Sequence, residues 1–216
     1  MSIDDLVKLD KKEFGLSFEL TADAFCLLND YGFTASTSSD DMERHIDRSI
    51  DLPSNGIKKV DTKSPRRNHT ALTDTIVCEY TNVNGEKGSA RGEADYFWCF
   101  TMSGDTFCYI YEFSRLDILN YALSVNPDPG NPVYIESGAI RPYHTWIHKW
   151  LKKDSWLMLH LDELVANLNY VKYDATDAFK LACRTLDKYG CGLLDYNNSE
   201  AWDKALKDVW ASTPTS

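Results

Sequence analysis

Two short segments that alternate between apolar and polar residues, 46–51 and 57–63, lie on either side of a turn sequence at 53–56. Alternation with a period of two is typical of a β-strand with one buried face, and a proline and a glycine within four residues favour a turn. The two segments are therefore predicted to pair as a hairpin. Pro65 ends the second strand, because proline has no backbone N–H to donate to a neighbouring strand.

A helix is predicted before this hairpin and a mainly β region after it. Leu20 and the apolar residues four, seven, eight and eleven positions later form one face of a helix over Ser17–Tyr31, and Gly32 ends it. The other predicted elements are a polar loop or weak strand (34–39), a β-meander with strands at 75–81, 94–100 and 107–113, the last of them central, further strands at 133–135 and 156–161, and helices at 116–123, 162–168, 175–189 and 199–210.

This order of elements predicts an α/β fold with a mixed central β-sheet flanked by helices. The chain of 216 residues is 43% hydrophobic and 12% aromatic, so it can bury a core and is not a disordered tail. We expect one α/β core over residues 1–168 and a helical C-terminal extension over residues 169–216.

The net charge of −10 argues against a protein that coats nucleic acid without specificity, because phosphate binding needs lysine and arginine. Residues 57–67 reverse this balance, with five cationic side chains against one acid and a local net charge of +4. Such a run is either a solvated loop or a local groove for nucleic acid. The candidates for contacting a nucleic-acid backbone are Lys58, Arg66 and Arg67.

The sequence lacks the signals for a membrane segment, for secretion and for several common types of site. The apolar runs are too short for a transmembrane helix, and the acidic start Met1–Asp5 has no hydrophobic signal segment, so we expect a cytoplasmic protein without a membrane partner. The six cysteines form no C-x-x-C pair, which argues against structural zinc. Neither a phosphate-binding glycine loop nor a serine-hydrolase nucleophile motif is found.

The triplet Asp61-Thr62-Lys63 lies on the second predicted strand. Residues i and i+2 of a strand project to the same side, so the Asp61 carboxylate and the Lys63 ammonium should share one site. Asp47, at the start of the preceding strand, would come beside Asp61 when the strands pair. Carboxylates suit Mg²⁺ or Mn²⁺, and a nearby cation can offset charge during phosphodiester hydrolysis. The expected metal ligands are Asp47, Asp61 and the Thr62 carbonyl oxygen.

A helix, an acidic residue at a strand start, a hairpin and a D-x-K triplet together resemble the PD-(D/E)XK nuclease superfamily. Here thirteen residues separate Asp47 from Asp61. The strings at 41–47, 60–68, 78–85 and 92–96 are similar to small phage-type members, over roughly residues 15–165. The resemblance implies a restriction-endonuclease-like core and a magnesium-dependent nuclease that acts on DNA rather than RNA, with Lys63 catalytic. A phage-encoded origin stays open.

The family also places a glutamate on the helix before the hairpin. Glu19 is the candidate for this catalytic position and Glu43 is its rival. A competing placement of the whole motif takes Asp95 and Glu112 as the acidic pair, but it puts Ser114 where the lysine belongs. We prefer the placement on Asp47 and Asp61.

Other residues have both an ordinary and a functional interpretation. Glu79 could add a metal ligand, although a solvent-facing strand residue is the more usual role, and His45 before a strand is usually structural. Trp146, Trp150 and Trp156 could stack nucleobases, although packing or partner contact is more usual.

Two further functions remain open from the sequence. The first is a catalytically inactive member of the same fold, acting as a binding or assembly protein. It would be favoured if the two aspartate carboxylates lay more than about 8 Å apart, too far for one metal ion to bridge. The second is an acidic inhibitor that mimics DNA, against which the basic run at 57–67 argues. The sequence does not decide between endonuclease and exonuclease, or between a monomer and a homodimer.

Overall fold

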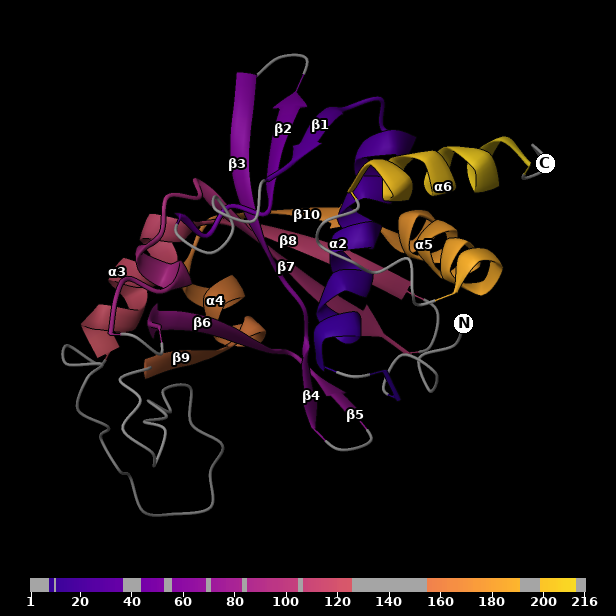
Figure 1. The fold of residues 1–216 in the computed structure, drawn as a ribbon. Helices are drawn as coiled ribbons and strands as arrows, with labels where there is room; N and C mark the ends of the chain where they lie inside the picture. Colours follow the sequence, from indigo (N-terminus) through magenta and orange to yellow (C-terminus); the bar gives the residue numbers. More distant parts are fainter. Residues whose placement is uncertain are drawn as a thin grey trace.

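A six-stranded mixed β-sheet organises the protein, which is described here from a computed structural model (Figure 1). The structure describes residues 8–9, 11–36, 44–52, 56–68, 71–82, 85–104, 107–125, 155–190 and 199–212. Its elements in chain order are α2 (Lys11–Leu28), β1 (Gly32–Ala35), β2 (Arg48–Leu52), β3 (Gly56–Lys63), β4 (Arg66–Asn68), β5 (Ala71–Thr73), β6 (Thr75–Thr81), the 3₁₀ turn η2 (Ser89–Arg91), β7 (Tyr96–Ser103), β8 (Phe107–Ser114), α3 (Arg115–Val125), β9 (Ser155–His160), α4 (Leu161–Asn167), β10 (Tyr170–Asp174), α5 (Thr176–Tyr189) and α6 (Ser199–Ala211).

The strands of the main sheet follow the order β1-β2-β3-β7-β8-β10. All neighbours are antiparallel except β3 and β7, which run parallel. The predicted hairpin is confirmed, since Arg48 lies opposite Val60 and Leu52 opposite Gly56. The α/β class with a mixed central sheet is confirmed as well.

The expected β-meander is only partly correct. β7 and β8 pair as predicted, and β8 lies inside the sheet between β7 and β10. β6, however, leaves this sheet and pairs with β9, more than seventy residues later in the chain, as a separate two-stranded sheet. The physical reason is burial: Ile76 and Cys78 of β6 pack onto Phe97 and Cys99 of β7 and share one apolar cluster with them.

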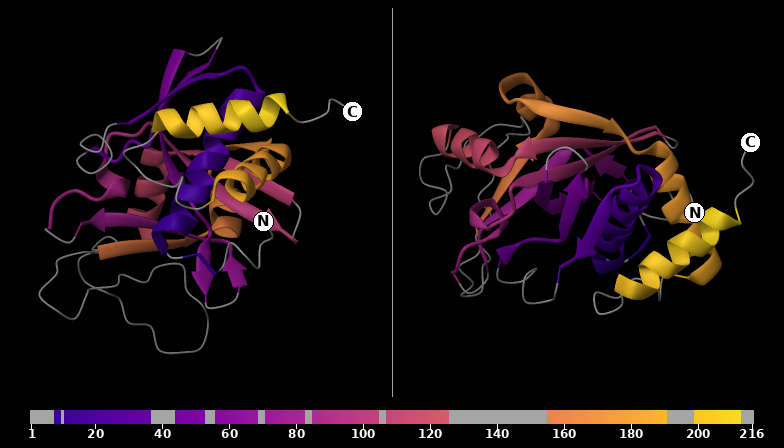
Figure 2. Two further views of the ribbon diagram at one scale, coloured as in Figure 1. Left: turned by 45° about the vertical axis from the view of Figure 1, so that its right-hand side comes forward. Right: turned by 90° about the horizontal axis from the view of Figure 1, so that it is seen from above.

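Two apolar clusters pack on the main sheet. One joins α2, α5 and α6 to residues such as Ile50, Val60 and Trp98. The other joins β6, β9, α3 and α4 to Phe97 and Phe113. Figure 2 shows α2, α5 and α6 gathered together, with α3 well away from them. Adjacent strand residues supply opposite clusters, as strand alternation requires.

The helix α2 begins at Lys11, earlier than the predicted start at residue 17, and ends at Leu28. From residue 16 to residue 26 it is buried almost all round, polar residues such as Glu19 and Asp23 included, because it lies between the sheet and α5. β1 follows at the place where a loop or weak strand was expected.

The segment expected as a helical extension, 169–216, contributes directly to this core. β10 pairs with β8 along its full length, α5 packs against α2, and Trp202 of α6 is buried. β10 was not anticipated because four of its five residues are exposed, so the strand has no apolar alternation to reveal it. The helices α5 and α6 lie where the sequence places them.

Some sequence-based expectations fall outside the residues described. These are the strand at 133–135, the rival glutamate Glu43, and the side chains of Trp146, Trp150 and Trp156. Within the described ranges, none of the helices has the length and apolar character needed to span a membrane.

Five cysteines are buried free thiols in the described part of the chain: Cys26, Cys78, Cys99, Cys108 and Cys183. Burial raises the pKa of Cys78 to about 12 and that of Cys183 to about 11. Because the thiolate is the reactive form, we expect these thiols to resist maleimide in the native protein and to react fully in denaturant. Peptide mass spectrometry after timed labelling measures this, and rapid native labelling of any of the five would contradict the core described here.

Candidate functional site

Asp61 and Lys63 form a buried ion pair on β3. Lys63 Nζ lies 2.6 Å from Asp61 Oδ1, and the two side chains are 14% and 5% exposed. The ammonium also lies 5.1 Å from the centre of the Phe97 ring. Residues i and i+2 therefore do share one side of the strand, as predicted. Burial lowers the pKa of Lys63, but the neighbouring Asp61 carboxylate more than offsets this and the pKa ends above its usual value, so the amine stays protonated.

Asp47 comes immediately before β2, and its carboxylate is bound to Thr62, the middle residue of the same triplet. Its Oδ2 accepts hydrogen bonds from the Thr62 backbone N–H (2.7 Å) and from the Thr62 hydroxyl (2.6 Å). Its own N–H donates to the Val60 carbonyl oxygen (2.9 Å). The pairing of β2 with β3 ends at Arg48 and Val60. The Asp47 carboxylate accepts the N–H of Thr62, which lies just beyond that last pair on β3. Asp47 lies next to β3 as expected, but its direct partner is Thr62.

The side chains of the predicted site residues therefore lie on two different sides of β3. The Thr62 side chain projects to the side opposite Asp61 and Lys63, because neighbouring strand residues alternate. Asp61 and Lys63 face the cluster that contains Phe97 and Cys78. Asp47 lies immediately before β2, and its carboxylate is hydrogen-bonded to Thr62, the residue between Asp61 and Lys63.

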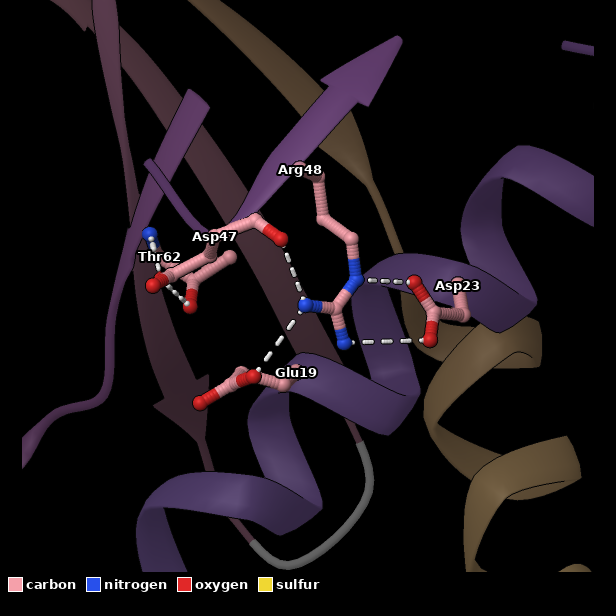
Figure 3. A network of polar contacts seen from close by, with 5 residues as sticks. All are labelled: Glu19, Asp23, Asp47, Arg48 and Thr62. Atoms are coloured by element: carbon pink, nitrogen blue, oxygen red, sulfur yellow. Dashed lines mark hydrogen bonds and ion pairs between the residues drawn. The ribbon is translucent and has the colours of Figure 1, made fainter. Parts of the chain in front are cut away.

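Glu19 is connected to Asp47 through an ion pair with Arg48, as Figure 3 shows. Arg48 Nη1 donates to Glu19 Oε2 (3.2 Å) and to the Asp47 carbonyl oxygen (2.7 Å). Its Nε and Nη2 donate to the two oxygens of Asp23 at 2.6 and 3.2 Å. One buried guanidinium therefore ties two turns of α2 to the start of β2 and brings Glu19 into the same network as Asp47.

The Arg48 network was missed from the sequence. Burial disfavours the charged form of Arg48, yet Asp23 and Glu19 reverse that effect and its pKa is raised. The ring of Trp202 on α6 also lies 5.5 Å from the guanidinium carbon of Arg48. A signal was present: Glu19 and Asp23 are four residues apart among the apolar residues of α2, so both carboxylates need a cation once the helix is buried.

The basic run does not form one free surface. Lys58 donates to Glu112 Oε1 (2.7 Å), lies 4.5 Å from the Tyr96 ring and is only 14% exposed. Contact with nucleic acid would have to break this ion pair. Arg66 and Arg67 lie on β4, the first strand of a small hairpin just after the triplet (Figure 1), and their side chains lie outside the described set.

The rival residues have structural partners of their own. Glu112 is buried and also accepts a hydrogen bond from Trp98 Nε1 (2.9 Å). Asp95 is exposed, and its carboxylate accepts the Lys59 N–H (3.0 Å). Glu79 lies on β6 in the separate two-stranded sheet. His45 Nε2 contacts the Lys87 carbonyl oxygen at 3.0 Å, which is a structural role.

The donor set fits a hard divalent cation by its chemistry. Asp47, just before β2, and Asp61 and the Thr62 carbonyl on the neighbouring strand β3 offer oxygen ligands, which suits Mg²⁺ or Mn²⁺. In the described ranges, however, no three His, Cys, Asp or Glu side chains are grouped as a ready metal site. Metal binding would require the Asp61 or Asp47 carboxylate to exchange its present partner for the ion.

No family model, curated protein or solved structure matches the chain, so its function is inferred from the placement of its own residues.

Proposed function

We propose that the protein is a Mg²⁺-dependent nuclease that hydrolyses phosphodiester bonds in DNA. The main support is the position of Asp47 just before β2 and of Asp61 and Lys63 on the paired strand β3, beside α2. Asp47 precedes β2, the D-x-K triplet ends β3, and Glu19 of α2 shares Arg48 with Asp47. This is the order of helix, acidic residue, hairpin and triplet on which the resemblance to PD-(D/E)XK nucleases depends.

The sheet around these residues supports the same proposal. After α2 the chain forms the antiparallel strands β1, β2 and β3, and β3 is then joined on its other side by the parallel strand β7. The motif therefore lies inside a mixed sheet with helices packed on it, the arrangement implied for a restriction-endonuclease-like core.

The proposed roles follow from the chemistry of each group. Asp47, Asp61 and the Thr62 carbonyl would hold the metal ion, which supplies Lewis-acid stabilisation of a phosphate oxygen when bound. Lys63 stays protonated beside Asp61 and offsets negative charge that develops on the phosphate. Arg48 keeps Glu19 close to the Asp47 backbone and so fixes the helix relative to the hairpin.

A specific observation also favours the second candidate, a catalytically inactive binding or assembly protein of this fold. Each motif group already has a protein partner: Thr62 for Asp47, Lys63 for Asp61 and Arg48 for Glu19. In that case these charges serve to hold the hairpin and α2 together, and the protein has no metal-dependent activity.

A cleavage assay decides between the two candidates. We expect the wild type to cut plasmid, single-stranded or branched DNA in Mg²⁺ or Mn²⁺ but not in EDTA. The double variant Asp61→Asn/Lys63→Met, which removes both charges of the pair together, should lose at least about a hundredfold in rate. The control Asp51→Asn changes an exposed carboxylate on β2 and should keep full activity. Cleavage that survives the double substitution, or a folded wild type without cleavage, would reject the nuclease proposal.

A further inference from the structure

β8 carries an aromatic side chain at every second position: Phe107, Tyr109, Tyr111 and Phe113. Because strand side chains alternate, all four project to the same face of the sheet. Phe113 is fully buried at the inner end of this row, whereas Phe107 is 51% exposed at the outer end. The row therefore leads from the core to the protein surface.

The edge strand β10 widens this row. Tyr170 lies opposite Phe113 and Lys172 opposite Tyr111 in the antiparallel pair. Tyr170 is 42% exposed, and its ring centroid is 5.6 Å from that of Tyr111. Figure 1 shows β10 beside β8 at the edge of the sheet. Phe107, Tyr109, Tyr111, Tyr170 and Lys172 are called the aromatic platform below.

Lys172 supplies positive charge directly over these rings. Its Nζ lies 3.9 Å from the Tyr109 ring centre and 5.2 Å from the Tyr111 ring centre, and the side chain is exposed. The acidic residue on the same face of β10 is Asp174, whose carboxylate accepts the Thr176 N–H at the start of α5 (2.9 Å). That acid is thus engaged with the helix, while the lysine is held among the aromatic rings.

We propose that the aromatic platform binds single-stranded DNA, with bases stacked on the tyrosine and phenylalanine rings and Lys172 contacting phosphate. The choice of nucleic acid as the ligand rests on the proposed nuclease function. Every base has a flat π-face, so exposed aromatic rings on a strand bind single strands with little sequence preference. The long, flexible lysine stem lets the ammonium move from a ring to a neighbouring phosphate.

The spacing of the rings favours a single strand over a duplex. Successive aromatic positions on β8 are two residues apart, which is about 6.8 Å along a strand. Bases in a duplex rise by only about 3.4 Å and are already stacked on each other. Only an extended, unstacked strand can place successive bases on successive rings.

The platform also lies on the same side of the sheet as the D-x-K pair. Lys63 contacts Phe97, and Phe97 belongs to the cluster that contains Phe113 and borders Tyr111. Substrate held at the platform is therefore on the Asp61 and Lys63 side of the sheet, not on the side covered by α2.

Neighbouring residues on β10 provide a matched pair of variants. Tyr170→Ser removes a platform ring, whereas Val171→Ser changes an apolar residue of similar exposure (48%) that points to the opposite face. Binding of a fluorescent thymidine oligonucleotide is measured by anisotropy in EDTA, so that no cleavage occurs. We expect Tyr170→Ser to weaken binding about 5- to 150-fold and Val171→Ser less than about twofold. A duplex of the same length should bind the wild type more weakly than the single strand.

Three outcomes would overturn the platform: equal affinities of the two variants, a preference for duplex, or loss of a dimer in Tyr170→Ser without loss of DNA binding. The last would make this edge an interface between two copies of the chain. Failure here is separable from failure of the nuclease proposal. Cleavage that persists with unaltered binding in Tyr170→Ser rejects only the platform, whereas binding that depends on Tyr170 without metal-dependent cleavage rejects only the nuclease.

Discussion

Replacing Arg48 with methionine should lower the free energy of unfolding by about 3–5 kcal/mol, the cost of removing one partner from a buried ion pair. Arg48 is 4% exposed, and it lies between Asp23 and Glu19, which are 2% and 7% exposed. Methionine keeps much of the side-chain volume, so the change in unfolding free energy reflects the lost charge and not a new cavity. Urea denaturation measures the effect. The control Arg184→Met changes an exposed arginine of α5 and should stay within about 0.5 kcal/mol of the wild type.

The loss of unfolding free energy in Arg48→Met should depend on pH, and the titration of Asp23 sets the direction of this dependence. Burial raises the pKa of Asp23 above 3.8, and Arg48 partly counteracts this rise. Without Arg48 the pKa rises further, so the folded variant keeps a proton on Asp23 at pH values where the unfolded chain has lost it. The folded state then loses stability as pH rises through that window. The deficit should be smaller at pH 5 than at pH 8, and a deficit that grows on acidification would contradict the assignment.

Removing Lys63 or Asp61 alone should cost about 3 kcal/mol or more, whereas removing both should cost clearly less than the sum. Each single change leaves one charge in a site where the side chains are only 14% and 5% exposed. The double variant Asp61→Asn/Lys63→Met leaves no such charge. Urea unfolding of the four proteins gives the coupling energy directly as a double-mutant cycle.

The exposed pair Asp203 and Lys207 on α6 is the internal reference for this cycle. Its side chains are 38% and 59% exposed, and its coupling should be below about 0.5 kcal/mol. Additive effects of Asp61 and Lys63 would show that the pair is open to solvent, contrary to the burial described.

The same variants separate structure from metal binding. Mg²⁺ or Mn²⁺ should raise the melting temperature of the wild type but not that of the double variant Asp61→Asn/Lys63→Met.

Local patterns predicted the parts of the fold that depend on neighbours in sequence. The hairpin before Lys63, the strand at 75–81 and the helix from 199 agree with the structure because period and turn chemistry act within a few residues. The shared side of Asp61 and Lys63 follows from the same rule. None of these required knowledge of distant parts of the chain.

Local sequence patterns could not predict contacts between segments that are distant in the chain. The strand at 75–81 was identified, but its partner β9 lies across a long intervening segment that offers no pairing signal. Lys58 looked like a surface cation, yet its partner Glu112 is 54 residues away on β8. Arg48 occupies a strand position whose burial depends on two acids of α2. In each case the deciding partner is set by tertiary packing.

The packing of α2 against α5 has a consequence for how the chain folds. α2 ends at Leu28 and α5 begins only at Thr176, and the Trp202 ring of α6 lies over Arg48, which holds α2 to the hairpin. Contacts of such large sequence separation form slowly because a long loop must close first. During folding, α2 and its buried charges therefore reach their final environment only after α5 and α6 have packed against them.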